Sequence, residues 1–344
     1  MVGEKDLYNI PGDTGWPWRM DKFVEYQHAV PAIHPMFLDG YMLNNQEEFT
    51  KDDYIWLSWL ISCTYNEITT VFVFDRLKQK FGDINQVEKD WCDDFWTCHR
   101  EDLVFNSARR YVKANNQFTQ LIMDFKTLTK GSPYDWVQKH ITDVDPVVNY
   151  TKLLKAIRTV PNVGRFSGDL FMESLLHITK RYGFFNIEED NKFDWAQCAN
   201  LTSGLFNILY MDDKANHYDK AKTVSEIDEA VLMKGLLAVQ KRVQETYPEQ
   251  DGRITMMITK ICSFRNLFKG TRYAGYHHDR ELECLLKYQK AFPQYKDLWN
   301  ECFQIRKDKF SPTLLGEIGG WTGIRKERKK LFLTEGLTGA EHHT

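Results

Sequence analysis

The chain has 344 residues, of which 42% are apolar and 27% are charged, and its formal net charge is −3. This composition is ordinary for a globular protein, and the length suffices for one large domain or for two that share a core. The charge excludes a global basic signal for nucleic acid, so any DNA contact has to come from a local patch.

Seven cysteines are scattered along the chain without a CxxC pair, and their number is odd. This pattern indicates reduced thiols in a cytoplasmic compartment and argues against a disulfide framework or a structural zinc site. Cys92, Cys98 and His99 lie close together, but their spacing fits no standard zinc site. The longest apolar run is too short and too interrupted to span a bilayer, so we expect no membrane partner.

Residues 1–50 are rich in Pro, Gly, aromatic and acidic residues and show little periodicity. We predict an extended segment that Trp16, Trp18 and Phe37 pack onto the body of the protein. Residues 51–310 are predicted to form the helical body, and residues 311–344 a Gly-rich, basic tail. The expected fold class is all-α, with two helical lobes around a cleft.

The segment from Tyr54 to Tyr65 is apolar nearly all round, which predicts a buried central helix. Asp52 and Asp53 would lie in its first turn, where acidic residues suit the helix dipole. The segment that follows, residues 71–77, is expected to be helical. Its β-branched residues leave a short strand open as an alternative.

Further helices are predicted at residues 85–97, 106–129 and 136–141. Arg109, Arg110 and Lys113 fall on one side of the second of these. The favoured interpretation of the three is a solvated basic face.

Residues 149–183 carry the motif around which the chain is organised. Apolar residues recur at helical spacing on both sides of Val160-Pro161-Asn162-Val163-Gly164-Arg165-Phe166, and Gly183 is a plausible stop. Pro, Asn and Gly tolerate special backbone angles, so the pattern predicts two helices joined by a tight turn. Such a helix-hairpin-helix can bring backbone N–H groups to a nucleic-acid phosphate. An ordinary helical corner without a ligand is the alternative.

After an acidic loop at residues 188–190, helices are expected at residues 195–210, 224–247, 254–268 and 279–289. Asp212 and Asp213 end the first of these. Paired acids of this kind could hold Mg²⁺, although a solvated helix end is the favoured interpretation.

Residues 264–279 hold three cations, two Tyr, two His and one Asp on a backbone broken by two Gly. Arg and Lys suit a phosphate or pyrophosphate, Tyr can stack on a base, and Asp279 can take a proton or cap the next helix. The candidate residues of this loop are Lys269, Arg272, Tyr273, Tyr276, His278 and Asp279.

Three stretches resemble one family: the hairpin at residues 160–168, the helix at residues 56–65 and the segment at residues 268–276. They resemble the phage α-glutamyl/putrescinyl thymine pyrophosphorylases, which are amino acid:DNA transferases with a DNA-glycosylase-like helical fold. The resemblance covers roughly residues 37–286. Asn162 stands where the glycosylase hairpin usually has a first glycine, a tolerable departure because Asn is the commonest non-Gly residue in the left-handed region.

The resemblance implies that an amine, from an amino acid or a polyamine, displaces pyrophosphate from 5-pyrophosphoryloxymethyluracil in duplex DNA. The setting would be the cytoplasm of an infected host cell. The resemblance implies no definite cofactor and leaves the use of Mg²⁺ open. By residue type, Arg272 and Lys269 would bind pyrophosphate, Tyr273 and Tyr276 the base, and Asp279 or His278 the proton. The DNA backbone would be held by the hairpin residues Asn162, Val163, Gly164 and Arg165.

Two other functions remain open. A base-excision glycosylase would need a catalytic Asp, or Lys plus Asp, soon after the second hairpin helix. That window holds Lys180 and the acids at residues 188–190, without a clear match. A non-enzymatic helical DNA-binding protein would need only the hairpin and the basic tail.

Overall fold

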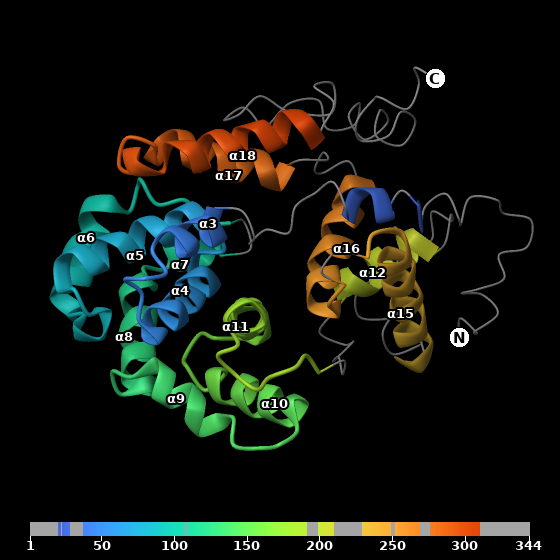
Figure 1. Cartoon of the computed structure of the whole chain (residues 1–344), viewed down its shortest axis with the longest axis horizontal. Helices are drawn as coiled ribbons and strands as arrows, with labels where there is room; N and C mark the ends of the chain where they lie inside the picture. Colours follow the sequence, from blue (N-terminus) through green and yellow to red (C-terminus); the bar gives the residue numbers. More distant parts are fainter. Residues whose placement is uncertain are drawn as a thin grey trace, which may run out of the picture. The chain divides into compact units, whose positions relative to one another are not determined.

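The computed structural model describes residues 20–21, 23–27, 37–106, 109–190, 199–209, 229–248, 252–268 and 276–309 (Figure 1). All regular secondary structure in these ranges is helical, which confirms the all-α fold class. The short strand considered for residues 71–77 does not form, because these residues lie inside the helix α5 (Glu67–Phe81).

The chain divides into two compact units. The first comprises residues 1–32, 191–283 and 301–344, and the second comprises residues 33–190 and 284–300. The predicted cleft and the predicted domain boundaries at residues 50 and 310 stay predictions. Within the described ranges, no helix is long and apolar enough to cross a membrane.

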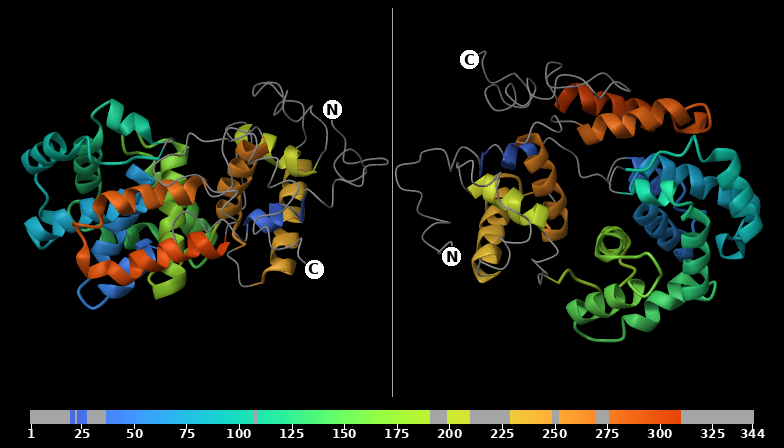
Figure 2. Two further views of the ribbon diagram at one scale, coloured as in Figure 1. Left: turned by 90° about the horizontal axis from the view of Figure 1, so that it is seen from above. Right: turned by 180° about the vertical axis from the view of Figure 1, so that it is seen from behind.

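The second unit is built around α4 (Lys51–Thr64), whose residues from Asp53 to Thr64 are all buried. Thr50 and Asp53 form a capping box at its start, and Tyr65 ends it in the left-handed conformation at φ 50°. Helices α5, α8, α9 and α11 lie against it (Figures 1 and 2). The predicted buried central helix is therefore confirmed.

Helix α3 (Phe37–Asn44) corrects the prediction that residues 1–50 are extended. Its first turn is held by the carboxylate of Glu67, which accepts hydrogen bonds from the N–H groups of Phe37 at 3.0 Å and Leu38 at 2.9 Å. These donors have no partner inside the helix, so a cap supplied by α5 stabilises α3. Phe37 is buried as expected, while Trp16 and Trp18 lie outside the described residues.

The second unit continues with η1 (Ile84–Gln86), α6 (Lys89–His99), α7 (Arg110–Ala114), α8 (Phe118–Thr129) and α9 (Pro133–His140). The single helix expected at residues 106–129 is thus wrong, because it breaks between α7 and α8. Asn116 takes the left-handed conformation there, with φ 52°, and its side-chain oxygen accepts a hydrogen bond from Trp96 Nε1 at 3.2 Å. A tertiary contact therefore supports the break.

Stacked aromatic rings form the core around α4. The rings of Trp59 and Phe125 lie parallel, with centroids 4.5 Å apart and an interplanar angle of 7°. Trp56 meets Phe125 edge-on at 4.9 Å, and its indole Nε1 donates to Asn85 Oδ1 at 2.8 Å. Aromatic pairs of this kind add to the stability that area burial alone provides.

The first unit contains α12 (Ala199–Leu209), α15 (Glu229–Thr246) and α16 (Ile254–Phe268). Helices α12 and α16 approach closely at Gly204, where a Cβ atom would lie 2.7 Å from the backbone oxygen of Ile261. Phe264 of α16 packs against Phe23 and Tyr26, each with ring centroids 5.4 Å apart. The predicted helices at residues 195–210 and 224–247 begin outside the described residues.

The last described elements are α17 (Tyr276–Tyr288), η3 (Pro293–Tyr295) and α18 (Lys296–Lys309). Their residues 284–300 belong to the second unit, where Tyr288 stacks on Phe72 with centroids 4.7 Å apart. Phe37 contacts Trp299 of α18 at 5.1 Å. These contacts pack residues 284–300 against α3 and α5 within the second unit.

Candidate nucleic-acid interface

The predicted helix-hairpin-helix is present as α10 (Pro146–Ile157) and α11 (Arg165–Tyr182). Asp145 caps α10 by accepting a hydrogen bond from the backbone N–H of Val147 at 2.9 Å, and Pro146 occupies the first helical position. Gly183 ends α11 in the left-handed conformation at φ 66°, as predicted.

The special backbone angle of the turn falls at Asn162, whose φ is 64°. Gly164 has φ −79° and ψ −174°, an extended conformation that any residue can adopt, and a Cβ atom there would meet nothing within 4 Å. Glycine is therefore not needed to build the turn. Its effect is to leave the N-terminal end of α11 without a side-chain cap.

Val163 supports the turn from inside. Its side chain is buried, as is that of Val160, and its backbone N–H donates to the carbonyl oxygen of Val160 at 3.1 Å. Neither its side chain nor its N–H is directed at solvent, so Val163 contributes packing to the hairpin. Asn162 and Gly164 beside it are exposed.

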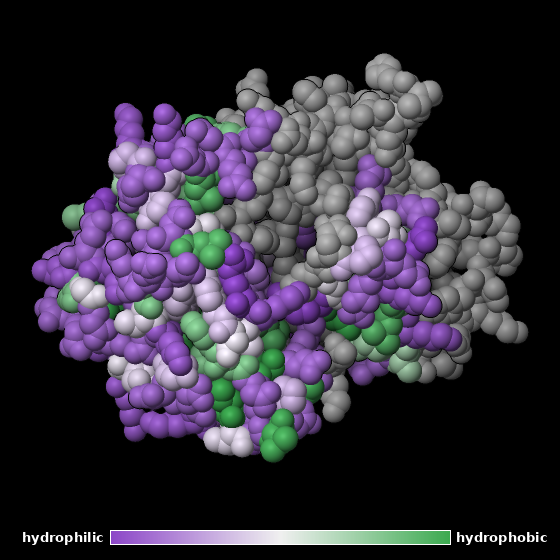
Figure 3. All heavy atoms as spheres, in the orientation of Figure 1, coloured by the Kyte–Doolittle hydropathy of each residue, from purple (hydrophilic) through white to green (hydrophobic). Residues whose placement is uncertain are grey.

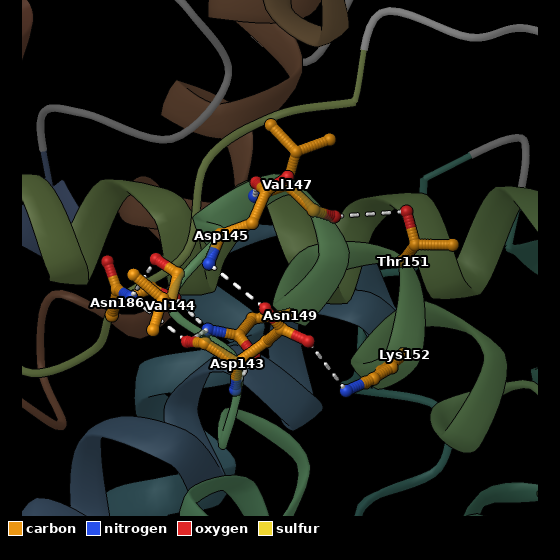
Figure 4. A network of polar contacts seen from close by, with 8 residues as sticks. All are labelled: Asp143, Val144, Asp145, Val147, Asn149, Thr151, Lys152 and Asn186. Atoms are coloured by element: carbon orange, nitrogen blue, oxygen red, sulfur yellow. Dashed lines mark hydrogen bonds and ion pairs between the residues drawn. The ribbon is translucent and has the colours of Figure 1, made fainter.

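Asn149, which is fully buried, fixes the start of α10. Figure 4 shows the polar contacts around it. Its Oδ1 accepts a hydrogen bond from the N–H of Asp143 at 2.8 Å, and its Nδ2 donates to the carbonyl oxygens of Asp143 and Asn186, both at 2.9 Å. These hydrogen bonds of Asn149 tie the segment before α10 to the segment after α11. Both ends of the hairpin are thereby held together at its base.

The hairpin is a local basic segment in a chain of net negative charge. Residues 146–168 contain the four cations Lys152, Lys155, Arg158 and Arg165 and no carboxylate. Asp169 pairs with Arg158 at 2.9 Å and with Arg165 at 3.3 Å, so one acid is shared by two guanidinium groups. Burial raises the pKa of Asp169 above its ordinary value although both arginines act to lower it.

Arg109 corrects the prediction of a solvated basic face, because this side chain is buried. Its Nε donates to the carbonyl oxygen of Cys63 at 3.2 Å, and its Nη1 donates to Tyr111 Oη and Ser167 Oγ. The third nitrogen, Nη2, is buried without a hydrogen-bond partner, and Arg109 has no carboxylate partner in the part of the chain that the structure describes. Because Ser167 lies in the first turn of α11, a buried positive charge sits beside the open end of that helix.

A second group of ionisable side chains joins α11 to α3. His177 Nε2 lies 2.6 Å from Asp39 Oδ1, and Arg181 Nη1 lies 3.6 Å from Asp39 Oδ2. The carboxylate is nearly buried, whereas a quarter of the histidine side chain is exposed. The other ring nitrogen of His177 makes no hydrogen bond within the described ranges, so the pair presents an imidazole whose orientation is set by Asp39.

Sequence reasoning missed this pair because Asp39 and His177 are 138 positions apart. Their sequence signal is limited to His177 and Arg181 standing four residues apart on one helix, which places them on the same face. Nothing in the sequence marks Asp39 as their partner.

The predicted pyrophosphate loop falls largely outside the described residues. Lys269, Arg272 and Tyr273 lie outside the described residues, as do Asp212 and Asp213. Tyr276, His278 and Asp279 form part of the first turns of α17, although their side chains lie outside the description. Asp279 is inside the helix, which begins at Tyr276, so its prediction as the N-cap is wrong.

The described residues contain no group of three His, Cys, Asp or Glu side chains that could hold a metal ion. Near His99, Cys92 is buried and Cys98 is exposed. Both interpretations of Asp212 and Asp213, a solvated helix end and a Mg²⁺ site, stay predictions, because the two residues lie outside the described ranges.

No family model, curated protein or solved structure matches the chain.

Proposed function

We propose that the chain binds duplex DNA through the α10–α11 hairpin and modifies a base in it, as the resemblance to amino acid:DNA transferases implies. The observation that carries the proposal is the hairpin itself, whose residues 146–168 hold four cations and no carboxylate and whose second helix begins uncapped at Gly164. Asp169, the next residue, pairs with two of these cations, Arg158 and Arg165. The N-terminal end of a helix and nearby guanidinium groups both favour a phosphate.

The geometry of the turn supports contact with a DNA backbone. Asn162 and Gly164 are exposed on either side of the buried Val163, so the backbone of the turn is accessible to solvent at these two residues. Lys155 and Arg158, at the end of α10, are exposed nearby in the sequence. Contacts of this kind position a protein on DNA without reading its sequence, which suits an enzyme that recognises a modified base by other means.

The proposed reaction is displacement of pyrophosphate from a 5-pyrophosphoryloxymethyluracil base by an amine. The amine nitrogen forms a bond to the methylene carbon, the carbon–oxygen bond to pyrophosphate breaks, and the amine loses one proton. His177, oriented by Asp39, is a further candidate acceptor for that proton, in addition to the predicted His278 and Asp279. Arg272 and Lys269 remain the proposed ligands of the departing pyrophosphate.

The first test is DNA binding, measured by fluorescence anisotropy of a labelled duplex at several salt concentrations. Replacing Lys155 and Arg158 together by Ala should weaken binding and reduce the salt slope by about two. Lys241→Ala is the matched control, since this exposed cation lies on α15 outside the hairpin. Equal slopes for the double variant and the wild-type protein would contradict the hairpin's part in DNA binding.

The second test concerns the chemistry. DNA carrying the activated base is incubated with the protein and a panel of amines, and the nucleosides are analysed by mass spectrometry. We expect an amine-substituted thymine, released pyrophosphate and intact N-glycosidic bonds. Abasic sites, seen as alkali-labile strand breaks, would instead favour the glycosylase, and unchanged nucleosides with normal DNA binding would favour the non-enzymatic DNA-binding protein.

A further inference from the structure

The hairpin exposes one aromatic ring. Phe166, the second residue of α11, is 43% exposed, whereas Val160, Val163 and Leu170 around it are buried. On the face drawn in Figure 3, hydrophobic surface gathers over the part of the second unit where Figure 1 places α10 and α11. Arg158 and Arg165 lie close to Phe166 along the hairpin, so an apolar ring accompanies the groups that suit a phosphate.

The ring of Phe166 is supported from behind. It meets the ring of Tyr65 edge-on, with centroids 5.5 Å apart and an interplanar angle of 77°. Tyr65 is buried, is fixed at the left-handed end of α4, and packs with Leu170 of α11. Packing of this kind holds the side chain of Phe166 in one rotamer when a ligand binds.

The first turn of α11 is also held by a hydrogen bond from a buried side chain. Ser167, which follows Phe166, accepts a hydrogen bond from the buried guanidinium of Arg109. The same guanidinium holds the carbonyl oxygen of Cys63 in the last turn of α4. Phe166 is therefore supported by its contact with Tyr65 and by the anchored residue Ser167 that follows it. The guanidinium of Arg109, which contacts Ser167, adds positive charge beside the turn.

We propose that Phe166 enters the base stack of the duplex held by the hairpin and unstacks the adjacent base. The inference rests on the proposed DNA binding but not on the chemistry that follows. Apolar side chains inserted between base steps separate the bases, and a phenyl ring has no hydrogen-bonding group with which to read sequence. A base released from its stack is what an enzyme acting on that base requires.

The experiment uses a duplex with 2-aminopurine at one position, whose fluorescence rises when the base leaves the stack. The full chain is titrated into this duplex while anisotropy of a second label reports binding. We expect a several-fold rise in 2-aminopurine fluorescence with the wild-type protein and its loss with Phe166→Ala. Phe166→Leu, which keeps an apolar side chain, should retain part of the rise.

The matched control is Leu237→Ala, because Leu237 of α15 is also 43% exposed but lies outside the hairpin. It should leave both signals unchanged. A circular-dichroism melt establishes that each variant is folded. Binding without a fluorescence rise, or an undiminished rise with Phe166→Ala, would overturn only the proposed unstacking by Phe166. Failure of the wild-type protein to bind the duplex would overturn this inference together with the proposed function.

Discussion

The guanidinium of Arg109 joins the first turn of α11 to the last turn of α4, donating to Ser167 Oγ and to the carbonyl oxygen of Cys63. Arg109, the N-cap residue of α7, thus links the central helix to the second helix of the hairpin. The carbonyl end of α4 carries partial negative charge, which favours the buried cation. The hairpin is therefore held by a polar contact as well as by apolar packing.

Removing this contact should destabilise the second unit. We expect Arg109→Ala to lower the free energy of unfolding by about 3 kcal/mol, because it removes hydrogen bonds to a charged group and leaves buried acceptors unpaired. Arg109→Lys should recover little, since an ammonium group cannot reproduce the planar fork. Urea unfolding measures both. Arg242→Ala, at an exposed ion pair with Asp21, is the control and should change stability by less than about 1 kcal/mol.

Gly164→Asp should separate DNA binding from folding. Gly164 occupies the N-cap of α11 in an extended conformation with open space around it, so Asp is accommodated and can cap the helix. Its stability should stay equal or rise by a few tenths of a kcal/mol. Its negative charge would face the DNA backbone, so duplex affinity should fall at least tenfold.

Gly164→Ser supplies the control for that experiment, because Ser also caps a helix but carries no charge. Its affinity for duplex DNA should stay within a few-fold of that of the wild-type protein. Equal affinity of the Asp and Ser variants at low salt would remove the N-terminal end of α11 from the DNA interface.

His177 can be tested apart from its contribution to stability. We expect His177→Gln to lower the single-turnover rate of base modification by on the order of a hundredfold if the imidazole accepts the amine proton. Asp39→Asn should lower the rate less, since it leaves the imidazole in place and changes only the orientation of the ring. Both variants need thermal melts, because the pair also links α3 to α11. A folded His177→Gln protein with the wild-type rate and pH profile would exclude the histidine from proton transfer.

The cysteines should differ strongly in reactivity. Burial raises the pKa of the Cys63 thiol to about 12, although Arg109 beside it favours the thiolate, and burial also raises the pKa of Cys92 to about 12. At pH 8 both should resist alkylation in the folded protein, whereas the exposed Cys98 should react. Mass spectrometry after brief treatment with iodoacetamide identifies the modified sites. Rapid labelling of Cys63 without unfolding would contradict its burial.

These thiols also predict how stability changes with pH. Their folded pKa values lie above that of an unfolded thiol, about 9, so the unfolded chain loses these protons first as the pH rises. Their contribution to stability is therefore retained below about pH 9 and lost progressively towards pH 12. Cys63→Ala should flatten this decline. Urea unfolding at pH 8, 9 and 10 measures the slope, and an unchanged slope would argue against a buried thiol.

The sequence by itself determined the local structure of the hairpin and of the central helix. The apolar pattern of residues 54–65 could only be buried on all sides, and Asp145, Pro146 and Gly183 mark helix ends through their own hydrogen bonding and backbone preferences. Asn162 likewise indicates a left-handed turn residue, and its φ is 64°.

The tertiary structure alone decided which polar side chains meet. Arg109 looks like a surface cation in the sequence, yet it is buried because Cys63 and Ser167, 46 and 58 positions away, supply its acceptors. Asp39 and His177 are 138 positions apart, and the start of α3 depends on Glu67. Helical periodicity fixes which face a residue occupies, but the partner across that face depends on how the helices pack, and local sequence does not encode that packing.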